Sequence, residues 1–573
     1  MIITTQNYKN AVESSSRRDY VVAKFGLFDK KAKGQVSNMV ADKQPFNDLN
    51  GLIDESLSSF RKYISCEEDR VLLDGSFYFV YDKTQPNAQQ TIPYWSEFFS
   101  LADGTFTVNP KITMEFSIDV NLIPVTIHCE EPVDSVTVRY YLDTVLQDTC
   151  VITGNTSITI ETTINTIGAF DTLEIEFVKT GTPERYVKVQ EIDLGYVRTF
   201  GKNEIADFSM TDSLDLFSNT MQSNQLHLTV ENPNKLYSLR NPSSEMNYLQ
   251  ERQQMTLYYY VLVNGQYQEL PLGTFLIKEF NAPGSYLQFS AYDERYFMNK
   301  IYYGSKFYEN TPLNTVLLDL FDYFNYTNYV IESNSVTLSG YIPRVDFREA
   351  LRMICEASKF VAKIDRYGVL TLFDYVNIVE TADYIIQPRL ISADNPRKSM
   401  YNNVIDVSQY KYNVYLDKIV YTAVLDPGTY DVLFDEFPAV NLDASNSVAT
   451  VTINHSYATG ANITVTVGGL VEIEARVYTN DKITHRIIKN PALESTDYAV
   501  QSVDNTLITT QFNDIALWKL SGSEIKNYID MVNLPFLEVG DLVQFEDDEG
   551  IEVKTRISRM EFKNSMFIKI EGE

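Results

Sequence analysis

The sequence predicts a mainly β, multi-domain protein that contains a small α/β part. Short runs of β-branched and aromatic residues, separated by turn residues, recur along most of the chain, as in proteins built from strands. Two helical patterns stand out, both within residues 301–376, and a weaker one lies near residues 50–62. The length of 573 residues corresponds to roughly three to five domains. Because 44% of the residues are hydrophobic, several packed cores are expected and wholesale disorder is excluded.

The strand runs are rich in Val, Ile, Thr, Tyr and Phe, which suit a pleated, half-buried surface. They lie at residues 21–28, 75–82, 136–142, 173–179, 255–263 and 451–457. Dipeptides that favour turns separate such runs, at Asp74-Gly75, Asp103-Gly104, Asn264-Gly265 and Glu549-Gly550. A repeat with a fixed period of about 20–50 residues is not evident, so a solenoid or a propeller is not supported.

The first clear helical pattern follows a Thr-Pro pair. We expect Thr311 to be the N-cap and Pro312 to occupy the first helical position. The apolar residues that follow have the spacing of a single helix face, and they are Val316, Leu317, Leu320 and Phe324.

The second helical pattern begins with a capping box in which Asp replaces Ser or Thr. Asp346 is the predicted N-cap and Glu349 follows three residues later. The residues on the predicted inner face are Phe347, Ala350, Leu351, Ile354 and Ser358. Residues 359–375 then predict two strands joined by a turn around Asp365–Gly368. Two helices with such a hairpin predict a small α/β unit within a β-rich chain.

These changes of pattern divide the chain into six segments. The segments are 1–107, 108–195, 196–300, 301–376, 377–480 and 481–573. The second is nearly all strand, rich in Thr and evenly spaced in its turns, which predicts a β-sandwich. In the last segment Val543 and Phe545 alternate with polar residues, and so do Val553 and Ile557 across the turn. This pattern predicts a half-buried antiparallel ribbon at the rim of a barrel.

The charge balance is strongly acidic. Lys plus Arg number 48 and Asp plus Glu number 77, so the formal net charge is −29. A phosphate backbone and an anionic membrane surface both need the opposite sign, so general binding to nucleic acids or membranes is disfavoured. No window approaches the ~18 apolar residues of a membrane span, and the N-terminal apolar run is too short for a signal peptide. We therefore expect a protein made in a cytoplasm and without a membrane span.

Tyrosine is unusually abundant, with 39 Tyr and 32 Phe beside two Trp. In runs such as Tyr258-Tyr259-Tyr260 and Tyr302-Tyr303, alternation along a strand turns one set of rings toward the core and the other outward. Because Tyr is favoured at protein interfaces, the outward set is either solvated or covered by another subunit. We expect Trp95 and Trp518 to be core or interface anchors.

No arrangement of residues predicts a chemical reaction. The four histidines fall in different segments, at His128, His227, His455 and His485. Motifs of metalloproteases, serine hydrolases, phosphate-binding loops and dinucleotide-binding loops are not found in the sequence. The four cysteines form no CxxC pair, so we expect buried reduced thiols at Cys66, Cys129, Cys150 and Cys355. The sequence thus predicts a protein that is not an enzyme, with no catalytic, cofactor-binding or metal-binding residues and no cofactor.

The acidic run at Glu546–Gly550 has two interpretations. An EF-hand loop with Gly550 at its sixth position would need acids in place of Phe545 and Arg556, and neither is acidic. Acids and Gly are the usual solvated residues of a hairpin turn, so a turn is favoured over a weak metal site.

Several ordered motifs resemble those of a known family. They are LPLGTFLIKEF at 270–280 with Leu272–Phe275, LQFSAYDERYFM at 287–298 with Ala291–Asp293, and the helices that lead to the hairpin at Asp365–Leu372. In this order they resemble phage tail-hub proteins, baseplate-hub-like proteins that close the tip of a tail tube. The C-terminal stretches VGDLVQFEDDEG and TRISRMEF resemble the last barrel of that family. The match covers roughly residues 200–573.

The N-terminal part resembles the front of tail-tip proteins from phages and prophages of Gram-positive bacteria, in which a β-sandwich follows. The stretches that carry this resemblance are RDYVVAKFGLFDKKAKG, CEEDRVLLDGSF and IPYWSEFFS. The family implies hub β-barrels at 196–300 and 481–573, a β-rich hub domain at 377–480 and an N-terminal tail-protein module at 1–107. Tail-tip proteins often continue into a lytic or receptor-binding extension, whereas this sequence ends at MFIKIEGE, so we expect no lytic activity of its own.

The resemblance implies a structural protein of the virion, located at the phage tail tip. Three chains would form a homotrimeric, pseudo-sixfold ring that closes the tail tube and connects it to distal-tail and fibre or spike subunits. DNA would only transit the channel, without sequence-specific binding, and an anionic wall would prevent it from sticking.

Two other functions stay open. A cell-wall or carbohydrate-binding adhesin of stacked β-domains would use exposed Tyr as sugar platforms, but it leaves the helix–helix–hairpin unit at 311–375 unexplained. A peptidoglycan hydrolase would need a cleft with two perturbed carboxylates, and no sequence motif supports one.

Overall fold

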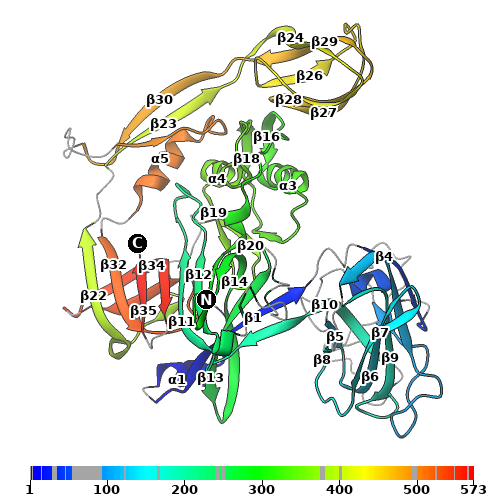
Figure 1. Cartoon of the computed structure of the whole chain (residues 1–573). Helices are drawn as coiled ribbons and strands as arrows, with labels where there is room; N and C mark the ends of the chain where they lie inside the picture. Colours follow the sequence, from blue (N-terminus) through cyan, green and yellow to red (C-terminus); the bar gives the residue numbers. More distant parts are fainter. Residues whose placement is uncertain are drawn as a thin grey trace. The chain divides into compact units, whose positions relative to one another are not determined.

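Strands dominate the computed structural model of the chain, which confirms the predicted mainly β fold class (Figure 1). The structure describes residues 2, 4–14, 16–28, 35–44, 47–53, 67, 93–121, 124–163, 168–235, 237–238, 240, 246, 249, 252–374, 381–398, 403–491, 500–522, 525–547, 549–563 and 567–572. The chain forms two units, one of residues 1–23, 200–235 and 254–573, and the other of residues 24–199 and 236–253. Among the described residues, no helix has the length and apolar character needed to cross a membrane.

The unit of residues 24–199 and 236–253 contains two antiparallel sheets. One has the strand order β2-β4-β9-β6-β7, and in the other β10 pairs with β3 and with β5, which pairs with β8. Apolar side chains from both sheets share a core, where the ring of Phe170 packs edge-on against Phe116 and Tyr140. The elements are β2 (Val36–Ala41), η1 (Leu49–Leu52), β3 (Tyr94–Trp95), β4 (Lys111–Asn121), β5 (Val125–Cys129), β6 (Val133–Leu142), β7 (Val145–Ile152), β8 (Thr159–Glu161), β9 (Ala169–Thr180) and β10 (Lys188–Phe200). The strands predicted at 136–142 and 173–179 lie within β6 and β9.

The unit that holds both ends of the chain is organised around one long sheet. Its strand order is β22-β32-β35-β34-β11-β12-β15-β14-β13, and every neighbouring pair is antiparallel. The pairing of β11 with β34 joins strands from the segments 196–300 and 481–573, which lie far apart in the sequence. The elements are α1 (Gln6–Glu13), β1 (Asp19–Phe28), β11 (Ile205–Ser213), β12 (Gln225–Glu231), η2 (Pro233–Lys235), β13 (Gln254–Val263), β14 (Gln266–Asn281), β15 (Tyr286–Tyr292), η4 (Glu294–Phe297), β22 (Ile391–Lys398), β32 (Ile525–Val532), β34 (Glu552–Lys563) and β35 (Phe567–Gly572).

The turns of this sheet follow the sequence signals. Asn264 and Gly265 join β13 to β14 with backbone φ angles of 50° and 84°, the left-handed conformation that an Asn-Gly hairpin turn requires. The short strand β33 (Leu542–Glu546) pairs with β34 and with β21 (Tyr384–Ile385), which the turn η5 (Pro388–Leu390) follows.

The C-terminal ribbon has the predicted alternation with one exception. Val543 and Phe545 are buried on β33, and Ile557 is buried on β34. Arg556 was predicted to point outward, but it is buried and donates a hydrogen bond to the carbonyl of Gly540. The guanidinium therefore satisfies a backbone carbonyl of the segment just before β33, which the alternation of strand residues does not reveal.

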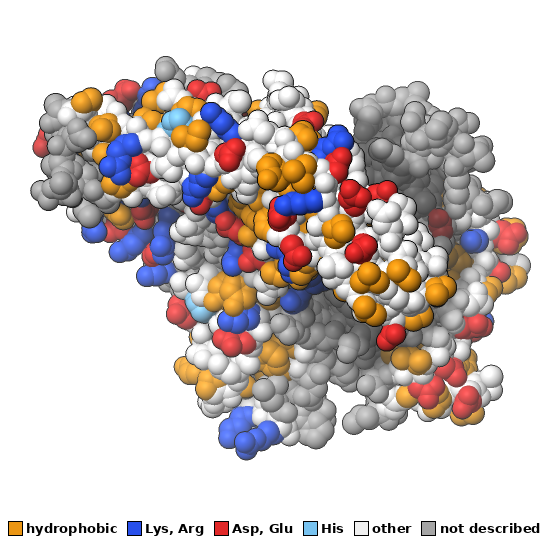
Figure 2. Space-filling model, turned by 90° about the horizontal axis from the view of Figure 1, so that it is seen from above, with side chains coloured by type: hydrophobic (Ala, Val, Ile, Leu, Met, Phe, Trp, Pro, Cys, Tyr) orange, Lys and Arg blue, Asp and Glu red, His pale blue; other side chains and the backbone are white. Residues whose placement is uncertain are grey.

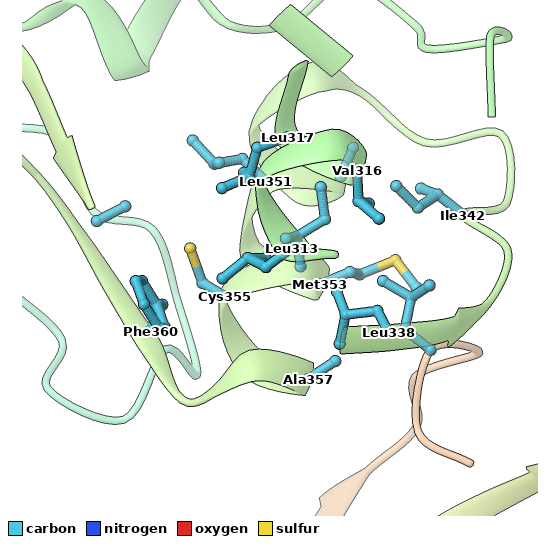
Figure 3. Packing of buried hydrophobic residues seen from close by; sticks show 14 of the residues in the cluster. Leu313, Val316, Leu317, Leu338, Ile342, Leu351, Met353, Cys355, Ala357 and Phe360 are labelled. Atoms are coloured by element: carbon cyan, nitrogen blue, oxygen red, sulfur yellow. The ribbon is translucent and has the colours of Figure 1, made fainter. Parts of the chain in front are cut away.

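The α/β unit packs around α3 (Leu313–Tyr323) and α4 (Phe347–Ser358). Their apolar faces meet strands β16 (Tyr308–Pro312), β17 (Tyr329–Ile331), β18 (Thr337–Gly340), β19 (Phe360–Ile364) and β20 (Leu370–Asp374) in one core (Figure 3). The helix α5 (Phe512–Leu520) adds Ile515, Ala516 and Leu520 to the same core. The predicted inner-face residues Val316, Leu317 and Leu320 are fully buried, and the five predicted for α4 are buried as well.

The start of α3 differs from the prediction. Thr311 is not the N-cap, because Thr311 and Pro312 extend β16 and lie opposite Leu338 and Thr337 of β18. The helix begins at Leu313, whose N–H donates to the carbonyl of Val336 at 2.9 Å. A carbonyl from the loop just before β18 therefore takes the place of the predicted side-chain cap.

The start of α4 is the predicted one. The Oδ1 atom of Asp346 accepts a hydrogen bond from the N–H of Glu349 at 2.8 Å. The Glu349 carboxylate pairs with Arg352, at 2.7 Å from Nη2, so the Asp346 half of the capping box is the half that forms. The predicted hairpin follows, with Asp365 Oδ1 accepting hydrogen bonds from the N–H groups of Tyr367 and Val369.

A ribbon leads from this unit to a small module of residues 414–478 (Figure 1). The ribbon pairs β23 (Val404–Lys411) with β30 (Asp481–Ile488), and β31 (Val500–Val503) adds to β23 in parallel. The module, called here the 414–478 module, has two three-stranded sheets with a shared core, ordered β24-β29-β26 and β25-β28-β27. Its strands are β24 (Val414–Leu425), β25 (Gly428–Leu433), β26 (Ala439–Asp443), β27 (Thr450–Tyr457), β28 (Gly460–Val467) and β29 (Gly469–Tyr478).

Some sequence predictions fall outside the described residues. These are the strand at 75–82, the turn at Asp74-Gly75, the thiol of Cys66 and residues 54–62 of the weak helical pattern. The described start of that pattern contains the single 3-10 turn η1.

Candidate interaction surfaces

One face of the sheet formed by β12, β15, β14 and β13 carries mainly uncharged side chains, with the charged residues Glu279 opposite Ser290 and Lys278 beside Tyr292. We call it the polar face; its residues are Gln225, His227, Thr229, Gln254, Thr256, Thr274, Leu276, Gln288, Ser290 and Tyr292. They alternate with fully buried apolar residues, for example Leu226 and Leu228 on β12 and Phe289 on β15. His227, Gln254 and Gln288 are exposed and the other seven are half-buried.

A hydrogen-bonded network orders the side chains on this face. Gln225 lies opposite Tyr292 and donates to its hydroxyl at 3.0 Å. The Gln225 amide nitrogen is 2.6 Å from Nε2 of His227, and Ser290 Oγ is 3.2 Å from Nδ1 of the same ring. These contacts hold the outward side chains in place before any partner binds, which lowers the entropy cost of association.

Aromatic stacking continues the polar face at one margin. The ring of Tyr292 stacks on Tyr296 with centroids 4.1 Å apart, and the Nζ of Lys278 lies 5.6 Å and 5.2 Å from the two centroids. At the other end, Thr274 donates to the carbonyl of Arg366, so the β19–β20 turn covers that corner.

The tyrosine run on β13 divides between core and surface as strand alternation predicts. Tyr259 is buried and its hydroxyl donates to Asp19, whereas Tyr258 and Tyr260 are half-buried. Burial raises the pKa of Tyr259 above its ordinary value, because the charged phenolate would be desolvated. Tyr260 stacks on Tyr20 at 5.1 Å, and Tyr20 meets the exposed ring of Tyr267 edge-on at 5.0 Å. This cluster places three tyrosines together beside the hairpin tip.

A second candidate surface lies in the other unit. The strand β7 ends its sheet and exposes Val145, Leu146 and Val151 by 61%, 52% and 64%. An edge strand with exposed apolar side chains is a template for contact with another chain. On the face of the molecule shown in Figure 2, hydrophobic side chains likewise form separate patches, with acidic and basic side chains between them.

The four histidines occupy four separate elements, as their spacing in the sequence predicts. His128 on β5 forms a buried polar chain, with Nε2 3.2 Å from Asp193 Oδ2 and Nδ1 3.4 Å from the hydroxyl of Thr159. His485 stacks on Phe512 at 4.0 Å. His455 lies on β27, and His227 belongs to the polar face.

The described cysteines are buried free thiols. Burial raises the pKa of Cys129 and Cys355 to about 12, so both stay protonated and unreactive at neutral pH. Cys150 is also buried. Within the described ranges, no three His, Cys, Asp or Glu side chains group as metal ligands. Among the described residues of the acidic run, Asp547 Oδ1 accepts hydrogen bonds from the N–H groups of Glu549 and Ile551, as in a turn.

The Ala-x-Asp motif at residues 291–293 has a structural role that sequence reasoning did not identify. Asp293 is fully buried, and its carboxylate accepts hydrogen bonds from Arg295 Nη2 at 2.6 Å and from the N–H of Asn224 at 2.8 Å. Arg295 also donates to Asn224 Oδ1 at 2.9 Å. The partner residue is about 70 positions away, so the network is invisible to local pattern analysis.

No family model and no curated protein sequence matches the chain. Several solved structures are similar to it over about two thirds of its length. The 43 kDa tail protein of prophage MuSo2 from Shewanella oneidensis is 12% identical, with a TM-score of 0.37 over 66% of this chain and 95% of that chain. Prophage tail protein gp18 from Listeria monocytogenes EGD-e is 11% identical, with a TM-score of 0.35 over 66% and 91%. A chain of the activated phage P2 baseplate is 10% identical, with a TM-score of 0.24 over 64% and 88%.

These three solved structures are thus phage tail and baseplate proteins.

Proposed function

We propose that the chain is a structural subunit of a phage tail tip, a hub-like protein that closes the tail tube and assembles through the polar face. The observation that carries this proposal is the mainly uncharged, hydrogen-bonded face of β12, β15, β14 and β13. Interfaces between protein subunits are depleted of charged residues, and the ten residues that define the polar face carry no formal charge. The ordered tail-hub motifs of the sequence lie on the same strands, because Leu272–Phe275 belongs to β14 and Ala291 to β15.

In this proposal the polar face of one copy packs against a second copy of the chain. Three copies form a homotrimeric, pseudo-sixfold ring between the tail tube and the distal-tail and fibre or spike subunits. The closure of segments 196–300 and 481–573 into hub barrels, and the division of the chain into six modules, remain predictions within this proposal. The exposed edge of β7 offers a separate contact for a neighbouring tail protein.

The acidic balance of the chain has a role in the same proposal. A channel wall of negative potential repels phosphate, so DNA passes through it without binding. A ring whose inner wall proves neutral or basic would contradict this part. The proposed protein acts as part of the virion and performs no chemical step of its own.

The proposal is tested by assembly with neighbouring tail subunits. The full chain is co-expressed with tail-tube and distal-tail proteins, and the purified complexes are imaged by cryo-electron microscopy. We expect a ring at the tube end with the polar face buried between copies. A complex that lacks the chain, or a ring in which the polar face is solvent-exposed, would contradict the proposal.

A further inference from the structure

We propose that a groove in the 414–478 module binds a neutral oligosaccharide. The groove lies where the start of β24, the loop between β25 and β26 and the end of β29 come together, and its volume is ≈ 550 Å³. Its lining includes Tyr415, Lys418, Asp435, Glu436, Phe437 and Tyr478. This inference does not rest on the proposed assembly role, because the polar face and the groove share no residue.

Three aromatic side chains line the groove. Tyr415 is 59% exposed and Phe437 is 43% exposed, whereas Tyr478 is half-buried. Large exposed aromatic side chains beside a concavity are typical of binding sites. Their apolar surface is unfavourably hydrated in the free protein, and a bound ligand removes it from water.

Two of the three aromatic rings are held from behind by other rings, and the third is covered by a lysine side chain. Phe437 packs edge-on against Tyr341 at 6.0 Å, and Tyr478 packs against Phe307 at 4.3 Å. Lys418 extends over the ring of Tyr415, with its Nζ 5.6 Å from the centroid. Because these neighbours fix the ring orientations, little rotamer entropy is lost when a ligand stacks on them.

The polar groups of the groove are suited to hydroxyl groups. Lys418 and Glu436 form an ion pair, which leaves the exposed carboxylate of Asp435 as the net charge of the lining. Asn480 donates to the hydroxyl of Tyr341 at 3.2 Å, and its carboxamide keeps an acceptor oxygen. A carboxylate, an amide and an ion pair can accept and donate hydrogen bonds along one ligand.

A neutral saccharide fits this combination better than other ligands. Its ring faces are apolar and pack on aromatic rings, and its hydroxyl groups bind carboxylates and amides. An anionic ligand would meet the uncompensated charge of Asp435. A purely apolar ligand would displace water from the Lys418–Glu436 pair and would offer no hydrogen bonds in its place.

A peptide that adds a strand to the module is also disfavoured. β24 forms the edge of its sheet, but its pairing is interrupted by bulges between Val414 and Leu416 and between Ile419 and Tyr421. Bulges twist an edge strand away from further pairing. The volume of the groove lies within the range of about 300–1,000 Å³ of small-ligand sites, which matches an oligosaccharide of a few units.

The test uses the fluorescently labelled full chain on an array of immobilised neutral oligosaccharides. The probes contain two to four units of glucose, galactose, rhamnose or N-acetylglucosamine. We expect binding to at least one of them, and titration calorimetry with that probe then gives its Kd. Tyr415→Ala and Asp435→Asn should each weaken binding about tenfold or more, and both should keep the melting temperature because the two side chains are exposed.

Tyr267→Ala is the matched control, because Tyr267 is 48% exposed and lies on the β13–β14 hairpin outside the groove. It should leave the Kd unchanged. Absence of binding to every probe would overturn the inference, and so would binding that survives both groove substitutions. If no saccharide binds and Tyr415→Ala abolishes contact with another tail protein, the groove is a protein interface and the inference is overturned. Ring assembly measured on the same variants keeps this outcome separate from the proposed assembly role.

Discussion

Asp212 on β11 is a buried carboxyl group whose neighbours do not fully compensate its charge. Its Oδ1 atom has no hydrogen-bond partner among the described residues. Desolvation raises its pKa to about 6, although Arg366 and Arg295 lower it in part. The folded-state pKa of Asp212 lies above its ordinary value, so the protonated carboxyl group favours the folded state. This contribution to the free energy of unfolding is fully present below pH ~4 and is lost as the pH rises through about 6.

We therefore predict that Asp212→Asn stabilises the protein at pH 7.5 by about 1–3 kcal/mol. The amide removes the charge that burial disfavours and keeps the shape of the side chain. Thermal unfolding of the two proteins at pH 5 and pH 7.5 measures the effect, which should shrink at the lower pH. Asp207→Asn is the control, because Asp207 is exposed on the same strand. A lower melting temperature for Asp212→Asn at pH 7.5 would show that the carboxylate is net stabilising.

The network at Asp293 leads to the opposite prediction. Asp293→Ala leaves the guanidinium of Arg295 buried without its carboxylate partner, since Arg295 is 1% exposed. We expect a loss of about 3–5 kcal/mol in the free energy of unfolding, measured by chemical denaturation. Asp322→Ala is the control, because Asp322 is exposed on α3, and it should change the free energy of unfolding by less than about 0.5 kcal/mol. Equal stability of the two variants would mean that water or another group satisfies Arg295.

At the scale of single elements, the start of α4 is stabilised by one side chain. Asp346→Ala removes the acceptor for the N–H of Glu349, so we predict a loss of about 0.5–2 kcal/mol. Hydrogen exchange of the first-turn amides of α4 reports the effect directly, and these amides should exchange faster. Asp346→Ser restores a capping oxygen and should recover most of the protection. Unchanged exchange in Asp346→Ala would show that tertiary packing alone fixes this helix end.

Local signals in the sequence were sufficient for much of the secondary structure. The Asp346 cap, the Asp365–Gly368 turn and the Asn-Gly hairpin each depend on residues within four positions of one another, so their spacing reveals them. The start of α3 was predicted wrongly because Val336, more than twenty positions downstream, supplies the acceptor. The helix α1 was not predicted, because its eight residues show only two buried positions, Tyr8 and Val12.

Long-range partners account for what the sequence could not predict of the candidate surfaces. The polar face exists because β12 pairs with β15 more than fifty positions away, which aligns His227 with Ser290. The groove of the 414–478 module combines Tyr415 with Phe437 and Tyr478 from different strands and loops. Tyrosine abundance indicated that interfaces were to be expected, but it did not indicate where they lie.

At the scale of the whole molecule, the central claim is that copies of the chain associate through the polar face. Like charges placed opposite each other in an interface cost several kcal/mol, so charged substitutions there should block association. His227→Glu with Gln288→Glu places two acids on the polar face at exposed positions, which should leave the fold of the single chain intact. Thr422→Glu with Thr452→Glu, both exposed in the 414–478 module, adds the same charge elsewhere.

Mass photometry of the full chain tests this claim most directly. The account predicts a species of three chains, or a multiple of three, for the unmodified protein and for the Thr422→Glu, Thr452→Glu control. It predicts single chains for His227→Glu with Gln288→Glu, with an unchanged melting temperature. A strict monomer at every concentration for the unmodified protein, with no association with tail subunits, would contradict the account, and so would a trimer that the polar-face substitutions leave intact.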